Sequence, residues 1–155
     1  MKAPYETRLI LLCARIKTTA SAQEEIHNIL LTQRLNWDKI IEIATTQETM
    51  PLLYYNLNHP DFKAFIPQDK LAIAQDYYYA NLNRNILFGK EAFSILEAAQ
   101  TQNINLIFLK GMALLATIYE HPALRVMADV DILVPQEDLQ KTALLLNKLG
   151  FKTSS

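Results

Sequence analysis

Two aspartates, Asp129 and Asp131, are separated by one residue and precede the apolar run 132–134. On a strand, side chains two residues apart project from the same face, so both carboxylates would lie together while Val130 points to the opposite layer. Two carboxylates on one face repel each other unless a cation lies between them. Mg²⁺ is usually held by one or two carboxylates and substrate phosphates. The pair therefore predicts a Mg²⁺ or Mn²⁺ site suited to phosphoryl or nucleotidyl transfer, although surface strands also carry such pairs by chance.

A second element is Lys110-Gly111, at the junction between an apolar run and a helical pattern. Glycine lets a backbone approach a phosphate closely, and a helix N-terminus offers free N–H groups with a favourable dipole. Lys110 adds a mobile positive charge. The same two residues are equally typical of a strand-to-helix turn with a solvated lysine, so the sequence leaves both interpretations open.

Arg125 is the third candidate, four residues before Asp129. A guanidinium group suits bidentate binding of phosphate or carboxylate. Arg125 could therefore bind the phosphates of a nucleotide, or it could pair with an acidic neighbour and hold the loop that leads to the aspartates. Both roles stay open at this point.

The elements that must position these residues are helical over the first two thirds of the chain. Ser21, followed by Glu24, and Asn36 are the predicted N-caps, and Gly89 is expected to mark close packing or a bend. Helices are predicted over Tyr5–Lys17, from Ser21 to about Arg34, and over Trp37–Ala44, Pro51–Leu57 and Gln68–Gln102. In the last and longest, the predicted buried stripe consists of Leu71, Tyr78, Leu82, Ile86, Phe93 and Leu96.

After Gln102 the pattern changes to alternating strands and helices. The predicted order is a strand over Ile104–Leu109, a helix over Gly111–Glu120, a strand over Asp129–Val134, a helix over Gln136–Leu149 with Gly150 at its end, and a strand from Phe151. The predicted fold class is α+β, with a helical N-terminal region over residues 1–100 and a partial α/β core with a truncated sheet over residues 101–155.

Composition limits the classes of partner. The formal net charge of −1 gives no global positive field, which disfavours nucleic acid as a partner. One cysteine, Cys13, cannot form an internal disulfide and is expected to be a small buried hydrophobe. The apolar run 9–14 is too short for a signal-peptide core, and no run approaches a membrane span. The sequence predicts a cytoplasmic protein with no membrane partner.

Taken together, these motifs resemble those of a known family. Their order is that of the nucleotidyltransferase superfamily, and the sequence is similar to the uncharacterised bacterial nucleotidyltransferases of the NTP_transf_5 type. The similar stretches read IFLKGMALLATIY, LRVMADVDILV and EDLQKTALLLNKLGF, with NWDKIIEIA and PLLYYNL in the helical region. The resemblance implies metal-dependent transfer of a nucleoside monophosphate from a nucleoside triphosphate (NTP) to an acceptor that the sequence does not identify.

The resemblance also implies residue roles. Asp129 and Asp131 match the paired metal ligands and catalytic carboxylates, Lys110 and Gly111 match the turn that meets the triphosphate, and Arg125 matches the arginine before the acidic strand. Two features depart from the family pattern: the usual glycine-serine turn is Lys-Gly here, and a third carboxylate on a later strand would lie beyond the sequence.

Two interpretations of these departures stay open. One is a fragment of a longer enzyme; separately, an exposed apolar sheet edge after Phe151 would favour either a homodimer or a missing C-terminal segment. The other is a catalytically inactive binding or regulatory module, of the toxin–antitoxin kind or an association scaffold.

Overall fold

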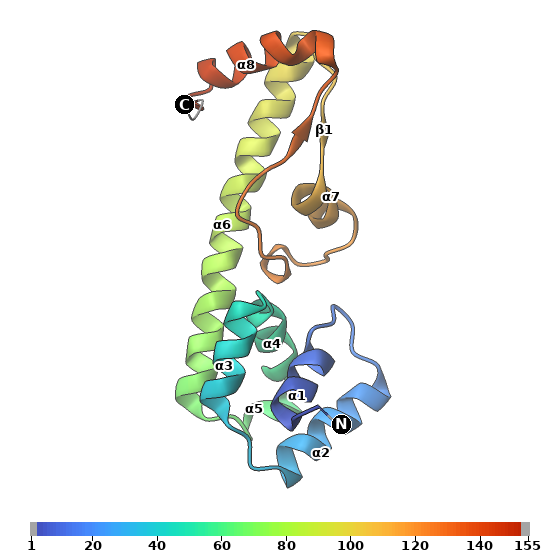
Figure 1. Ribbon diagram of the computed structural model, residues 1–155, viewed down its shortest axis with the longest axis vertical. Coiled ribbons are helices and arrows are strands. Elements are labelled where there is room, and N and C mark those ends of the chain that lie inside the picture. Colours follow the sequence, from blue (N-terminus) through green and yellow to red (C-terminus); the bar gives the residue numbers. More distant parts are fainter. Residues whose placement is uncertain (1–2, 153–155) are drawn as a thin grey trace. The chain divides into compact units, whose positions relative to one another are not determined.

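The structure is a computed structural model that describes residues 3–152, and within this range it contains eight α-helices and one two-stranded sheet (Figure 1). The helices are α1 (Tyr5–Cys13), α2 (Ala20–Thr32), α3 (Trp37–Thr46), α4 (Met50–Leu57), α5 (Pro60–Lys63), α6 (Gln68–Thr101), α7 (Lys110–Thr117) and α8 (Leu139–Lys148). The strands are β1 (Ile107–Phe108) and β2 (Ile132–Leu133), and short 3-10 turns cover Pro122–Leu124 and Gln136–Asp138. The fold is thus mostly helical, with less sheet than the predicted α+β class implies.

The chain forms two compact units. The first consists of the residues up to Asn83 together with Ala123–Val126, and the second consists of Arg84–Pro122 together with the residues from Met127 onward. Helix α6 contributes its first half to the first unit and its second half to the second. The predicted site residues Lys110, Gly111, Asp129 and Asp131 all fall in the second unit, whereas Arg125 falls in the first.

Helix starts in the first unit follow side-chain capping. The Oδ1 of Asn36 accepts a hydrogen bond from the backbone N–H of Lys39 at 3.1 Å, which confirms the predicted cap of α3. The predicted cap at Ser21 is wrong, because the Oγ1 of Thr19 accepts from the N–H of Ala22 at 3.3 Å and begins α2 one residue before Ser21. Serine and threonine are comparable caps, so the sequence did not distinguish the two positions.

The core of the first unit is built around α1, which packs against α2, α3 and α4. The side chain of Asn56 in α4 is buried, and its Nδ2 donates to the carbonyl of Cys13, the last residue of α1, at 2.8 Å and to that of Arg15 at 3.0 Å. Cys13 itself is fully buried, and burial raises the pKa of its thiol to about 12. Since the thiolate is the reactive form, this supports the interpretation of Cys13 as a packing residue.

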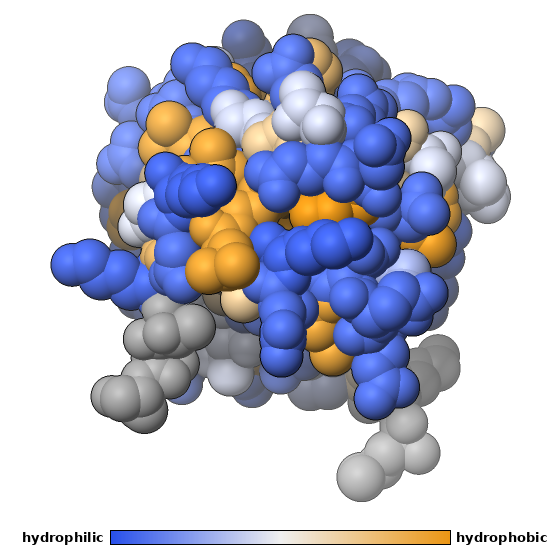
Figure 2. Space-filling model, turned by 90° about the horizontal axis from the view of Figure 1, so that it is seen from above, coloured by the Kyte–Doolittle hydropathy of each residue, from blue (hydrophilic) through white to orange (hydrophobic). Residues whose placement is uncertain are grey.

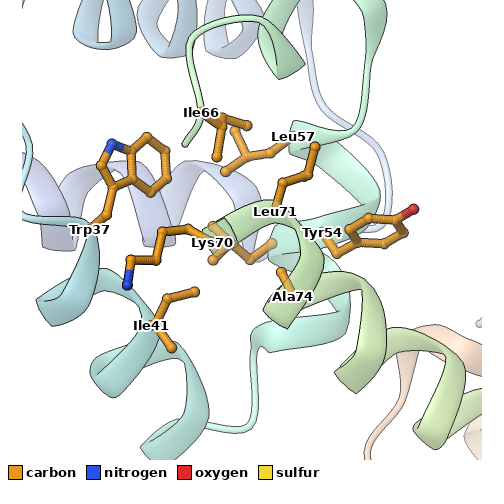
Figure 3. Close-up of a pocket in the computed structure, with 9 residues that line it drawn as sticks. Trp37, Ile41, Tyr54, Leu57, Ile66, Lys70, Leu71 and Ala74 are labelled. Atoms are coloured by element: carbon orange, nitrogen blue, oxygen red, sulfur yellow. The ribbon is translucent and has the colours of Figure 1, made fainter. Parts of the chain in front are cut away.

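The cavity shown in Figure 3 has a volume of about 10 Å³ and lies inside the first unit. The aliphatic stem of Lys70 lies along it while its Nζ pairs with the carboxylate of Asp38 at 2.6 Å. That volume holds about one water molecule. The cavity is therefore a packing defect between α3, α4 and α6 rather than a ligand site.

Helix α6 buries only part of the predicted stripe, in which Tyr78 is buried as predicted, at 7% exposed. Of the residues predicted for it, Ile86 and Phe93 are exposed, at 43% and 60%. The buried positions recur at intervals of three, four or seven residues and are Ala74, Tyr78, Asn81, Asn85, Ala92, Ile95 and Ala99. The prediction followed the large side chains alone, whereas the buried face of this helix also contains three alanines and two asparagines. Gly89 lies inside the continuous helix, and a Cβ there would meet nothing within 4 Å, so close packing does not explain it.

The core of the second unit lies between α6, α8 and the sheet. It contains Ile95, Ala99, Ile104 and Leu145, with Ile132 packed against it. Helix α8 ends at a Schellman motif, in which the N–H groups of Gly150 and Phe151 donate to the carbonyls of Asn147 and Leu146. Gly150 has a φ of 96°, which confirms its predicted role at the helix end. Phe151 and Lys152 are not in a strand, and the rest of the strand predicted from Phe151 lies outside the described residues.

Both predicted strands are shorter than expected. Strands β1 and β2 pair antiparallel, with Ile107 opposite Leu133 and Phe108 opposite Ile132. Extending this register would pair Val130 with Lys110 and Asp129 with Gly111. Because the chain turns into α7 at Lys110, it offers no strand partner there, and beyond β2 only one ladder hydrogen bond forms, from the N–H of Leu109 to the carbonyl of Asp131. The prediction that Asp129 and Asp131 lie within a strand is therefore wrong, since both precede β2.

Hydrophobic side chains also reach the surface. Figure 2 shows one face of the molecule, on which hydrophilic residues predominate and hydrophobic ones emerge in patches. In the sheet, the cross-strand neighbours Ile107 and Leu133 are 61% and 52% exposed. Among residues 3–152, none of the helices has the length and apolar character needed to cross a bilayer.

Candidate functional site

The candidate site begins where β1 turns into α7. Leu109 is extended, with φ −109° and ψ 172°, and α7 starts at Lys110. Lys110 has a φ of 44°, a left-handed conformation that costs a residue with a Cβ about 1–2 kcal/mol. Such strain persists only where the surrounding structure enforces it, and it is concentrated at functional sites. The first N–H groups of α7, which have no acceptor within the helix, follow this strained residue.

The register of the sheet brings Asp131 to this turn. The N–H of Leu109 donates to the carbonyl of Asp131 at 2.9 Å, which extends the ladder by one bond beyond β2. Val130 and Ile132 line a cavity of about 300 Å³ together with Ala92 and other residues of α6 and α8. Since successive side chains in an extended segment alternate, Asp131 points away from this apolar layer. Val130 and Asp131 therefore face opposite sides of the chain, as the sequence predicts, although the segment is not a full strand.

Lys110 and Asp131 form an ion pair at this turn. The Nζ of Lys110 lies 3.0 Å from Oδ2 of Asp131, with side chains that are 75% and 33% exposed. The pKa of Lys110 is raised, first by the hydrogen bond with Asp131, then by the Coulomb attraction of that carboxylate, and least by the charge of Asp129. Asp129 thus contributes to the potential at the ammonium, although it is the more exposed carboxylate. The structure thus pairs Lys110 with Asp131, and the charge of Asp129 also acts on the ammonium.

Gly111 has a packing role that the sequence did not reveal. A Cβ at Gly111 would collide with the Sδ of Met127 and lie 2.8 Å from its Cγ. Met127 is 5% exposed and follows the loop that leads to the aspartates. A Cβ at this position would therefore force the buried Met127 side chain to shift, so glycine lets Met127 lie against the first turn of α7. This contact adds to the predicted approach to a phosphate, which remains a proposal.

Gly111→Ala is expected to destabilise the second unit by about 1–3 kcal/mol, because the added methyl group overpacks the contact with Met127. Gly89→Ala is the matched control, since it adds the same methyl group in open space and should stabilise α6 by about 0.5–1 kcal/mol. Urea denaturation followed by circular dichroism measures both. Equal stability of the two variants would contradict the close contact at Gly111.

Arg125 is positioned by a different set of contacts. The Nδ2 of Asn81 in α6 donates to the carbonyls of Ala123 and Arg125, at 2.7 and 2.9 Å, and Asn81 is 4% exposed. These contacts lie within the first unit and fix the backbone of the loop. The site of Lys110, Asp129 and Asp131 is built from the second unit alone, so a phosphate-binding role for Arg125 depends on the sequence argument.

The donor set suits a hard divalent cation. The two aspartates provide carboxylate oxygens, and the Lys110 ammonium already neutralises one of them. Among residues 3–152, no three His, Cys, Asp or Glu side chains gather into a metal cluster. Mg²⁺ does not need such a cage, because it is typically held by one or two carboxylates and completes its coordination with waters and substrate phosphates. In number and chemistry, the two carboxylates therefore fit what such a cation needs.

Two positioning residues escaped the sequence analysis. Met127 resembled an ordinary apolar residue in a loop, and Asn81 was hidden in the polar part of a long helix. A signal for Asn81 exists in hindsight, because Asn81 and Asn85 are four residues apart and share a helix face. The Nδ2 of Asn85 likewise donates to the loop, at the carbonyl of Pro122.

Comparison with known proteins gives one match. None of the curated proteins and none of the solved structures is significantly similar to the chain. The family model described as uncharacterised nucleotidyltransferase matches residues 33–155, which cover most of the sequence and include the site. The chain belongs to this uncharacterised nucleotidyltransferase family.

Proposed function

We propose that the protein transfers a nucleoside monophosphate from an NTP to an acceptor, with Asp129 and Asp131 as the carboxylates that hold Mg²⁺ or Mn²⁺. The observation that carries the proposal is the meeting of an acidic segment with a strained lysine at the first turn of α7, where Lys110 and Asp131 lie 3.0 Å apart. Membership of the nucleotidyltransferase family supports it. The NTP and the metal would come from the cytoplasm.

Each residue has a defined task in this proposal. Asp129 and Asp131 would hold the cation, which would supply positive charge for the triphosphate when bound. Lys110 and the N–H of Gly111 bind phosphate oxygens at the helix N-terminus. Arg125, four residues before Asp129 in the sequence, is proposed as a further phosphate ligand. Binding and orienting the triphosphate are thus the contributions of these side chains.

The reaction itself is a displacement at the α-phosphorus. An oxygen of the acceptor forms a bond to the α-phosphorus, and the bond from that phosphorus to the oxygen bridging toward the β-phosphate breaks. Pyrophosphate leaves, and the proton of the acceptor hydroxyl passes to solvent or to a base. The fold alone does not identify the acceptor, because related sites serve unrelated substrates.

A label-transfer experiment tests the reaction class. The protein is incubated with Mg²⁺ and an NTP labelled at either the α- or the γ-phosphorus, with pools of hydroxyl-bearing small molecules and proteins as acceptors. Transfer of the α-label with release of pyrophosphate is the expected result. Transfer of the γ-label alone would identify phosphoryl transfer and contradict the proposal.

The second candidate is a nucleotide-binding module without turnover. The observation that favours it is the small number of carboxylates at the site, because no third His, Cys, Asp or Glu side chain joins Asp129 and Asp131 in a metal-binding group within residues 3–152. Such a module would bind a metal–NTP complex through these aspartates but would transfer neither label. Binding without transfer, across all acceptor pools, would select this candidate.

A further inference from the structure

The cation that neutralises Asp131 in this structure belongs to the protein itself. The ammonium group of Lys110 lies 3.0 Å from Oδ2 of Asp131, which is the carboxylate that the proposed function assigns to the metal. An ammonium and a divalent cation at one carboxylate repel each other. Binding of the metal at Asp131 and retention of Lys110 on the same group therefore oppose each other.

The ion pair is suited to being exchanged. The Lys110 side chain is 75% exposed, and ion pairs at such exposure are weak because solvent screens them and long side chains lose entropy. The backbone of Lys110 is fixed at a φ of 44° at the start of α7, so its side chain begins from one place while its four-carbon stem stays mobile. The ammonium can leave Asp131 without any change in the helix.

We propose that Lys110 is a tethered counter-ion: it holds Asp131 while the site is empty and moves to the triphosphate when the metal–NTP complex binds. This inference rests on the proposed function and adds to it an order of binding for the metal and the nucleotide. The lysine disfavours binding of the metal alone and favours binding of the metal together with the nucleotide. A lysine at this turn, in place of the glycine-serine turn of the superfamily, would then set the order in which the site binds its ligands.

The prediction is a pair of effects with opposite signs. Lys110→Met keeps most of the side-chain length and removes the charge. It should raise the affinity for Mn²⁺ alone about fivefold, because the metal no longer has to displace an exposed ion pair. It should lower the affinity for the Mn²⁺–NTP complex at least about tenfold, because a charge-assisted contact to phosphate is lost.

Binding of Mn²⁺ is measured by the loss of the free-ion electron paramagnetic resonance signal, and binding of the complex is measured by calorimetry. Lys141→Met is the matched control, because Lys141 is also exposed and pairs with a different carboxylate (Asp138, at 3.5 Å). This substitution changes the net charge by the same amount as Lys110→Met. Lys110→Gly is the second variant: it also relieves the positive φ and so protects against a loss of folding. It should shift both affinities in the same directions as Lys110→Met.

The outcomes separate this inference from the proposed function. If both Lys110 variants fold and bind Mn²⁺ alone no more tightly than the Lys141 variant, the counter-ion role is wrong while the metal–nucleotide site stands. A fall in both affinities would also overturn it, since it would make Lys110 a structural residue. If the unmodified protein binds no Mn²⁺–NTP complex, the proposed function fails and the inference fails with it.

Discussion

Asp131→Asn and Asp129→Asn should each weaken binding of a Mg²⁺–NTP complex at least about 100-fold. Changes to groups that merely orient a metal ligand cost 10- to 100-fold in affinity, so loss of a charged ligand should cost at least as much. The effect on folding should be small. Asp131 loses an ion pair that is largely exposed, and such pairs contribute at most about 1 kcal/mol.

Equilibrium dialysis with labelled NTP measures this effect, and thermal melts confirm that the variants fold. Glu137→Gln is the control, because it removes one negative charge from an exposed residue of the same unit. It should bind the complex as the unmodified protein does. If the Asp131 variant binds the complex as tightly as the unmodified protein does, the carboxylate is not a ligand of the metal and the prediction is wrong.

Asn81→Asp is expected to be the most destabilising of the predicted changes, at about 3 kcal/mol or more. The Nδ2 of Asn81 donates to two backbone carbonyls at 2.7 and 2.9 Å, and the residue is 4% exposed. An isosteric carboxylate would place an acceptor-only, charged group against both carbonyls in a buried position. The result would be the loss of two hydrogen bonds and the cost of a buried charge.

Asn83→Asp makes the same chemical change two residues later at an exposed position of the same helix, and it should change stability by no more than about 0.5 kcal/mol. Both positions lie in the first unit, as does the single tryptophan, Trp37. Urea denaturation followed by the fluorescence of Trp37 therefore reports on the unit that contains the change. Similar midpoints for the two variants would contradict the structural role of Asn81.

The sequence predicted the helical elements well because their signals are local. The cap at Asn36, the long helix from Gln68 and the glycine after the last helix follow from capping, proline and glycine chemistry within a few residues. The buried face of α6 was not predictable in the same way. Asn81 is buried because a loop 42 residues later provides acceptors for its amide, and no local pattern encodes that contact.

The site was predicted in its residue types but not in its geometry. An acidic pair next to an apolar run predicts a strand, yet strand length depends on the partner, and the partner turns into α7 at Lys110. The ion pair of Lys110 with Asp131 is also a result of register, because it needs Leu109 to lie opposite Asp131. Gly111 was singled out for a phosphate, while the structure gives it a contact with Met127 that sequence spacing does not reveal.

The central claim is that the two aspartates form a site for a metal–nucleotide complex, and one titration tests it most directly. The protein is titrated by calorimetry with ATP, GTP, CTP and UTP in turn, with Mg²⁺ present and again with the metal removed by a chelator. The account predicts saturable binding of at least one NTP that is lost without the metal. Absence of binding by the folded protein with Mg²⁺ present, or equally tight binding without it, would contradict the account.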